Sequence, residues 1–331
     1  MRQLAKEMGN VVHIGAKRMS AGGWSALVLV GLTLAFGVGD AQAAFPGGNG
    51  RIAVAVEKWR LPDPCRRDVP HGCEPETYSS TIETVLPSGR GRRVLRSFPV
   101  AQSATGPVWS PTGKLLALQQ GNRLAIIRRD GTALRRLPAL TSGERTPTWS
   151  PQGDRLAFTG SSVCCNWLYT VRPDGTGLRR VIAQEALMPA WSVTGTIAFV
   201  NNTGRRPGYS RLRAGLYTIS PDGSRLRRLS GRTGRPDWSP DGSRIAFSRG
   251  DQIFTARTDG SGLRRLTSRG SDPAWSPDGK RIAFIRDGDL YLMSANGGAL
   301  KRVIDARQPD PELPDRPWAE LGAPSWQPLP G

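Results

Sequence analysis

One phrase recurs along this chain and limits its fold more than any other feature. It reads proline, any residue, Trp-Ser-Pro-Asp-Gly, then basic residues and Ile-Ala-Phe, and its cleanest copies span residues 236–247 and 273–284. Looser copies complete a series of six, whose tryptophans are Trp109, Trp149, Trp191, Trp238, Trp275 and Trp326. A phrase repeated at intervals of roughly 37 to 51 residues is typical of a β-propeller, in which each repeat forms one blade. Because they recur at equivalent positions, we expect these tryptophans to pack in the core.

Each copy predicts four short strands, which we name a to d in chain order. In the fifth copy we expect them at 236–239, 244–248, 252–256 and 263–266. Asp241-Gly242 and Asp259-Gly260 predict tight turns after strands a and c, because Asp-Gly tolerates the positive φ that such turns need. The 40 glycines and 27 prolines of the chain suit many short strands joined by turns.

The two ends of the repeat region complement each other. Residues 51–56 resemble a strand b without a strand a before it, and residues 324–328 resemble a strand a without a strand b after it. We therefore predict an all-β fold, a six-bladed β-propeller over 44–331 whose last strand closes the first blade. The expected blades are 51–98 with 324–328, 107–139, 147–183, 189–231, 236–267 and 273–304.

Residues 1–43 have the order of a secretory signal peptide. Residues 1–20 carry the basic residues of the leader, residues 21–39 are uncharged and largely apolar, and Ala41-Gln42-Ala43 offers small residues for cleavage. An uncleaved anchor is the alternative, since the apolar stretch is barely long enough to span a bilayer. In both cases we expect the leader to contact the membrane and the protein to be exported, to the periplasm, the cell wall or the medium.

The phrase, its period and its six copies resemble the TolB-type propeller repeat of exported bacterial proteins, a relative of WD40 repeats. The resemblance covers about residues 45–328 and implies a propeller that binds a partner. In TolB itself, an N-terminal α/β domain precedes the propeller, which docks a peptidoglycan-associated lipoprotein. Here the first repeat follows the leader at once. The matched positions are structural, so the resemblance carries over no binding residue.

The connections between strands differ in length by type. Those from a to b and from c to d are short and uniform, whereas those from b to c and from d to a vary. In a four-stranded meander the two types lie at opposite ends of the blade, so we expect every insertion on one face of the ring, the inserted face. The inserted stretches are 59–80, 160–167, 201–215 and 305–321.

Aromatic and arginine side chains occur together in these stretches and suit a glycan, a peptide or a phosphate-bearing partner. The candidate binding residues are Trp59, Arg60, Trp167, Arg205, Arg206, Tyr209, Arg211 and Trp318. The alternative is that the long connections only cover the ring and that their arginines keep it soluble.

The formal charge of +19 raises the question of a polyanionic partner. Basic pairs recur on the predicted strand d, at 92–93, 135–136, 179–180, 227–228, 264–265 and 301–302. Basic residues on an outer strand prevent edge-to-edge pairing, which accounts for these pairs without a ligand. Attraction to anionic wall polymers or lipid headgroups stays open, and nucleic acid is not expected in an exported protein.

The four cysteines of an exported chain favour disulfides. Cys65 and Cys73 lie in the first insertion and Cys164 and Cys165 are adjacent, so three connectivities stay open. Zinc is disfavoured because the spacing fits no common site and the chain has two histidines, His13 in the leader and His71.

The scarcity of histidine also disfavours catalysis, since a nucleophilic triad would have to use His71. We predict no catalytic residue, no metal and no cofactor. Ca²⁺ at the Asp-Gly turns is an alternative, but turn conformation accounts for these aspartates.

The predicted function is that of a non-enzymatic binding module for a protein or glycan of the cell envelope. The alternative is a carboxylate-dependent hydrolase or lyase that acts on a glycan or peptide at the mouth of the propeller channel. Convergent Asp and Glu side chains there would favour the enzyme, and an arginine-and-aromatic surface would favour binding. The partner, its class and the oligomeric state stay open at this point.

Overall fold

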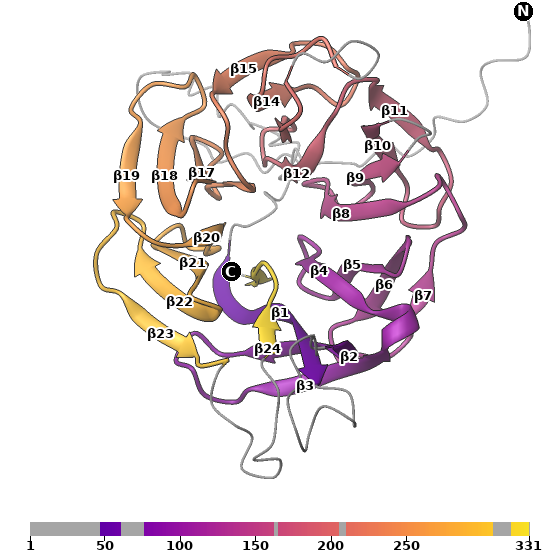
Figure 1. Cartoon of the computed structure of the whole chain (residues 1–331), viewed down its shortest axis with the longest axis vertical. Coiled ribbons are helices and arrows are strands. Elements are labelled where there is room, and N and C mark those ends of the chain that lie inside the picture. The colour runs from indigo at the N-terminus through magenta and orange to yellow at the C-terminus, as the bar shows by residue number, and fades with distance from the viewer. Residues whose placement is uncertain (1–46, 61–75, 162–164, 205–209, 307–318, 331) are drawn as a thin grey trace, which may run out of the picture. The chain divides into compact units, whose positions relative to one another are not determined.

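Six antiparallel sheets form a closed ring around a central axis (Figure 1). The structure, a computed structural model, describes residues 47–60, 76–161, 165–204, 210–306 and 319–330, all within the compact unit Asp40–Gly331. The prediction of an all-β, six-bladed propeller is confirmed. No helix in these ranges is both long and apolar enough to cross a membrane.

The strands follow the a-to-d order within each blade, from the channel outward. Blade 1 contains β25 (Ser325–Leu329) and β24 (Ala319–Leu321) side by side with β1 (Gly48–Arg60), then β2 (Glu76–Val85) and β3 (Arg93–Pro99). A short 3-10 helix, η2 (Val100–Gln102), leads to blade 2, which contains β4 (Ala104–Trp109), β5 (Leu115–Gln120), β6 (Arg123–Arg128) and β7 (Arg135–Arg136). Blade 3 contains β8 (Glu144–Trp149), β9 (Leu156–Ser161), β10 (Asn166–Val171) and β11 (Arg179–Ile182).

The second half of the ring repeats the pattern. Blade 4 contains β12 (Leu187–Trp191), β13 (Ile197–Asn201), β14 (Gly215–Ile219) and β15 (Arg227–Ser230). Blade 5 contains β16 (Pro236–Trp238), β17 (Arg244–Arg249), β18 (Gln252–Arg257) and β19 (Arg264–Thr267). Blade 6 contains β20 (Ser271–Trp275), β21 (Arg281–Arg286), β22 (Asp289–Ser294) and β23 (Lys301–Ile304).

The last strand completes the first blade, as predicted. β25 pairs antiparallel with β1, with Trp326 opposite Ile52 and Ser325 opposite Ala53. The closing contact is therefore a backbone ladder between residues separated by almost the whole described chain. Since the ring closes, neither end of the sheet series exposes an unpaired inner edge.

Two inserted stretches contain more strand than we predicted. β1 continues to Arg60 and β2 begins at Glu76, so that most of the described part of 59–80 is an extended hairpin. β24 takes three residues from the end of 305–321 and pairs with β1 beyond β25. The interpretation of these residues as loop was wrong, because a longer ladder satisfies backbone N–H and C=O groups that a loop would leave to solvent.

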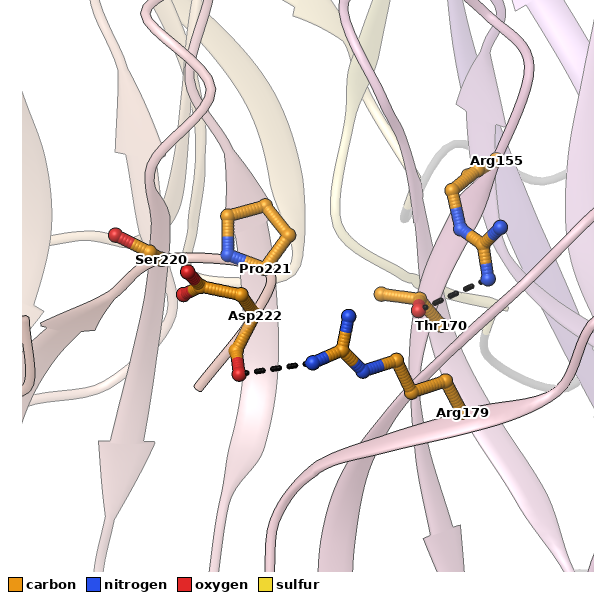
Figure 2. Close-up of a pocket in the computed structure, with 6 residues that line it drawn as sticks. All are labelled: Arg155, Thr170, Arg179, Ser220, Pro221 and Asp222. Carbon is orange, nitrogen blue, oxygen red and sulfur yellow. Dashed lines mark hydrogen bonds between the residues drawn. The ribbon is translucent and has the colours of Figure 1, made fainter. Parts of the chain in front are cut away.

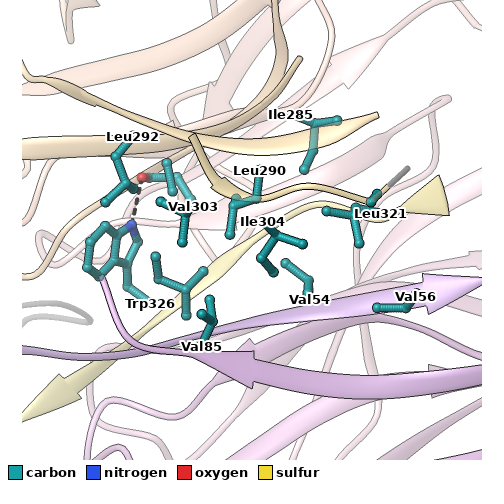
Figure 3. Close-up of a cluster of buried hydrophobic side chains, with 14 residues drawn as sticks. Val54, Val56, Val85, Ile285, Leu290, Leu292, Val303, Ile304, Leu321 and Trp326 are labelled. Carbon is teal, nitrogen blue, oxygen red and sulfur yellow. Dashed lines mark hydrogen bonds between the residues drawn. The ribbon is translucent and has the colours of Figure 1, made fainter. Parts of the chain in front are cut away.

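The core lies between blades rather than within them. Six clusters of buried apolar side chains occur, and each is shared by two adjacent blades. At the closing boundary, Trp326 and Val54 of blade 1 pack with Leu290 and Leu292 of blade 6 (Figure 3). All six repeat tryptophans are between 0% and 5% exposed, which confirms them as core.

A second contact joins every blade to the next at the turn between strands c and d. The glycine of this turn has positive φ, 84° at Gly131, and packs under strand d of the preceding blade. A basic side chain from that strand d donates to a carbonyl of the same turn. The six bonds, between 2.6 and 3.2 Å long, are Arg96 to Gly131, Arg135 to Pro173, Arg179 to Asp222, Arg227 to Asp259, Arg264 to Asn296 and Lys301 to Ser88.

These bonds change the interpretation of the basic pairs on strand d. We expected them to protect the outer edge, but the first basic residue of the pair in five blades ties its blade to the next one. In blade 1 the same task falls to Arg96, whereas Arg92 pairs with Glu83. Much of the rim's positive charge therefore has a structural partner.

The value of one such bond can be measured at the boundary of blades 5 and 6. Arg264→Ala removes the bond to the Asn296 carbonyl and should lower the free energy of unfolding by about 0.5–1 kcal/mol, a modest value because the site is exposed. Arg265→Ala, one residue along the same strand, removes an equal charge and is the matched control. If urea unfolding showed the same loss of free energy of unfolding in both variants, the assignment would be wrong.

Candidate functional site

All four insertions belong to the same face of the ring. They leave between β1 and β2, β9 and β10, β13 and β14, and β23 and β24, which are b-to-c or d-to-a connections. Of the eight candidate residues, Trp167 and Arg211 are described with their side chains. Trp59 and Arg60 end β1 and are described through their backbone pairing with β2. The other four lie outside the described residues, namely Arg205, Arg206, Tyr209 and Trp318.

Trp167 is held in place by an arginine of the neighbouring strand. It lies on β10 and is half-buried, and the guanidinium carbon of Arg180 on β11 is 4.7 Å from its ring centroid. The Tyr169 ring follows at 6.5 Å. A cation over an indole face fixes both groups, so the exposed part of Trp167 is presented in one orientation. The sequence analysis placed Arg180 among the rim charges and missed this role.

Arg211 is exposed on the connection between β13 and β14, and its backbone is anchored to blade 3. Its N–H donates to Oε1 of Gln184 at 2.6 Å. Beneath it, the fully buried Asn201 donates through Nδ2 to Oγ of Ser210 at 2.7 Å and to the carbonyl of Glu185 at 3.1 Å. Buried polar groups that satisfy one another in this way rigidify the loops that carry them.

The two anchored groups are linked through residues 184 and 185. Glu185 accepts the backbone N–H of Asn166, next to Trp167, while Gln184 accepts that of Arg211. We call the surface of Trp167, Arg180, Gln184 and Arg211 the blade 3–4 platform. The clue in the sequence was Asn201, a polar residue directly after the apolar run 197–200, and Glu185, a carboxylate just before strand a.

The innermost residues of the blades come from the second position of the Pro-x-Trp phrase. Blades 1, 3 and 5 have a polar residue there and blades 2, 4 and 6 an apolar one, in the order Ser325, Val108, Thr148, Ala190, Asp237 and Ala274 around the ring. Each polar side chain accepts the backbone N–H of the next blade's tryptophan, from Trp109 to Ser325, from Trp191 to Thr148 and from Trp275 to Asp237.

The other three boundaries use a different bond. There the tryptophan indole donates to the carbonyl of the apolar residue, from Trp149 to Val108, from Trp238 to Ala190 and from Trp326 to Ala274. The indoles of Trp109, Trp191 and Trp275 have no hydrogen-bond partner among the described residues. The two kinds of boundary therefore alternate around the channel.

Asp237 is the carboxylate of this inner ring. It borders a cavity of about 40 Å³ with Arg235 and Trp275. Asp237 as a residue is half-buried, but its carboxyl group is enclosed, and this burial raises its pKa to about 7. The hydrogen bond from Trp275 and the charge of Arg235 act in the opposite direction. Among the described residues that line the cavity, Asp237 is the one acid, so no carboxylate pair faces it.

The pKa of Asp237 predicts a pH dependence of stability. A carboxyl whose pKa is raised on folding stabilises the folded state below its unfolded pKa of about 3.8 and loses that stabilisation as the pH rises through about 7. We expect Asp237→Asn, which keeps the acceptor for Trp275, to remove this loss in urea unfolding between those values. The exposed Asp251 of the same blade supplies the control, Asp251→Asn. If the free energy of unfolding of Asp237→Asn fell with pH as steeply as that of wild type, the assignment would be wrong.

Two carboxylates meet elsewhere on the inserted side of blade 1. Glu57 of β1 lies opposite Glu320 of β24 in the ladder. Burial, and then the charge of Glu320, raise the pKa of Glu57. Like charges directly opposite each other weaken a strand pair. The short β24 should therefore pair less firmly with β1 once the pH is high enough for both glutamates to be charged.

The predicted disulfides fall mostly outside the described residues. Cys65, Cys73 and Cys164 lie there, and Cys165 is described and 6% exposed. The pairing of the four cysteines therefore stays a prediction. In the described ranges no three His, Cys, Asp or Glu side chains are grouped to hold a metal ion.

Comparison with solved structures supports the fold. The chain aligns with a structure from Agrobacterium tumefaciens assigned to TolB with a TM-score of 0.58, at 22% identity, over 78% of this chain and 90% of that one. It aligns with TolB from Acinetobacter baumannii with a TM-score of 0.61, at 17% identity, over 86% and 68% of the two chains. The chain has the TolB-type propeller fold.

The likeness to TolB does not extend to close sequence relationship. No protein-family model matches the sequence, and no curated protein matches it. A chain of the nidogen/laminin complex aligns as well as TolB does, with a TM-score of 0.62 at 11% identity over 85% of this chain and 100% of that one. Identities this low establish the shared propeller and leave function to the site itself.

Proposed function

We propose that this protein is an exported, non-enzymatic propeller whose inserted face binds a protein of the cell envelope, with an envelope glycan as the second class of partner. The observation that carries the proposal is the blade 3–4 platform, where an indole and two arginines stand on anchored backbone. Tryptophan and arginine are the residues that contribute most to protein interfaces, and anchoring reduces the entropy lost on binding. A chain of the nidogen/laminin complex supplies a precedent for a propeller of this fold in a protein complex.

The enzymatic alternative rests on one observation, the Glu57–Glu320 pair. A carboxylic acid with a raised pKa beside a second carboxylate is the arrangement that glycoside hydrolysis uses. Glu320 lies exposed on a three-residue strand, however, and the channel cavity adds the single acid Asp237. Release of reducing ends from envelope glycans by wild type, and its loss in Glu57→Gln, would establish the alternative and replace our proposal.

The platform is tested by removing the arginine that stacks on Trp167. Arg180→Ala frees Trp167, so we expect the affinity for the partner enriched from bacterial envelope extracts to fall about tenfold or more. Arg265→Ala is the matched control, because Arg265 faces Phe254 in the ladder of blade 5 as Arg180 faces Tyr169 in blade 3. The measurement is capture on immobilised protein followed by titration of the enriched partner. Equal recovery and affinity for both variants would reject the platform as the binding surface.

A further inference from the structure

A groove on the opposite face has features of a ligand site. It lies between blades 3 and 4 where the short turns meet, has a volume of about 400 Å³, and is lined by Arg155, Thr170, Arg179, Ser220, Pro221 and Asp222 (Figure 2). This face carries no insertion, so the groove is independent of the proposed partner surface. It is built from the a-to-b and c-to-d turns and from strands c and d, which every blade repeats.

Both arginines of the groove are held by one end of their guanidinium group. Nη2 of Arg155 donates to Oγ1 of Thr170 at 3.2 Å and to the carbonyl of Gly177 at 2.7 Å. Nη2 of Arg179 donates to the carbonyl of Asp222 at 3.0 Å. The remaining N–H groups of the two side chains have no acceptor among the described residues, so two oriented cations border the groove. A fixed guanidinium loses little entropy when it binds an oxyanion.

Asp222 adds an acceptor at the far side of the groove. Its Oδ1 accepts the N–H and the hydroxyl of Ser224 at 2.9 and 2.7 Å, and these bonds lower its pKa, with Arg179 adding to the effect. The carboxylate is therefore charged at neutral pH. Two guanidinium groups and one carboxylate leave the groove with an excess of one positive charge and with an acceptor for ligand hydroxyl groups.

We propose that this groove binds a phosphate ester that carries neighbouring hydroxyl groups, such as a polyol or sugar phosphate. The phosphate oxygens take the free N–H groups of Arg155 and Arg179, a charge-assisted contact for which guanidinium geometry is suited. A ligand hydroxyl donates to Asp222. The volume exceeds what a bare phosphate fills, which favours an ester over the inorganic ion.

The decisive variant removes one arginine of the groove. In calorimetric titrations of the full chain with glycerol 3-phosphate, we expect saturable binding by wild type and a loss of about tenfold or more in Arg155→Gln. Arg51→Gln is the matched control, because Arg51 makes the same contacts in blade 1, to Oγ1 of Thr84 and to the carbonyl of Gly91. The control removes an equal charge away from the groove and should bind as wild type does, whereas a general attraction of anions predicts equal losses in the two variants.

Several results would overturn the proposal. No saturable binding by wild type, equal binding by wild type and Arg155→Gln, or equal loss in Arg51→Gln would each do so. Binding of uncharged glycerol as strong as that of its phosphate would show that the arginines do not recognise the ligand. Soluble glycerol 3-phosphate and phosphatidylglycerol vesicles, each compared between wild type and Arg155→Gln, separate a soluble ester from a lipid headgroup. Because the platform variants leave this face unchanged, either proposal can fail without the other.

Discussion

Removal of residues 324–331 is expected to abolish cooperative unfolding of the ring. The truncation takes away β25, and with it the ladder to β1 and the fully buried Trp326. Loss of a buried tryptophan side chain alone costs about 3–5 kcal/mol, and a domain is stable by only about 5–15 kcal/mol. Blade 1 would also expose the inner edge of β1, so we expect aggregation together with loss of the sharp thermal transition.

The effect of the truncation can be separated from that of a shortened tail. Leu329→Ser changes a residue of the same strand that is 38% exposed and should leave the transition nearly unchanged. Trp326→Ala keeps the backbone ladder and should fall between wild type and the truncation. A truncated protein with a wild-type melting temperature in calorimetry would show that the ring does not depend on its closing strand.

Gly131→Ala is expected to destabilise the boundary between blades 1 and 2 by about 2–5 kcal/mol. Gly131 has φ of 84°, and an added Cβ would come within 2.1 Å of the Leu95 carbonyl oxygen. The left-handed conformation costs an alanine about 1–2 kcal/mol, and forcing an atom into packed backbone adds about 1–3 kcal/mol. The shift would also disturb the bond from Arg96 to the Gly131 carbonyl.

A second glycine separates the cost of the positive φ from the cost of the close contact. Gly195 has φ of 81°, but a Cβ there would meet nothing within 4 Å. Gly195→Ala should therefore show the conformational cost alone, and the difference between the two variants in urea unfolding measures the close approach between blades. If both variants lost the same stability, the c-to-d turn would not be a tight contact between blades. The six bonds from strand d to the next blade's turn would then lack supporting evidence.

The repeat phrase predicted the architecture because its residues act locally and at fixed spacing. The Asp-Gly turns and the buried tryptophans have one role in every copy, so a period in the sequence becomes a ring in space. Because every copy carries the same residue types, the phrase does not show which basic residues make the bonds between blades. Arg264 and Arg265 look alike in sequence, yet one reaches the next blade and the other does not, which depends on the direction that each strand position faces.

The functional surface was predictable only in outline. The lengths of the connections identified the face, and residue type singled out Trp167 and Arg211. Arg180, Gln184 and Asn201 belong to the site through contacts across strands and blades, and no period or motif marks such contacts. Asp237 could have been noticed, because it replaces a small or uncharged residue at the second position of the phrase.

Because the two kinds of tryptophan bond alternate, the smallest unit that repeats around the axis is a pair of blades, and the ring consists of three such pairs. A ring with an odd number of blades would place two boundaries of the same kind next to each other and break the alternation. Gain or loss of a single repeat should therefore be poorly tolerated, whereas an enlarged or reduced ring with an even number of repeats keeps the alternation. Engineered relatives with eight blades should accordingly assemble more readily than those with seven.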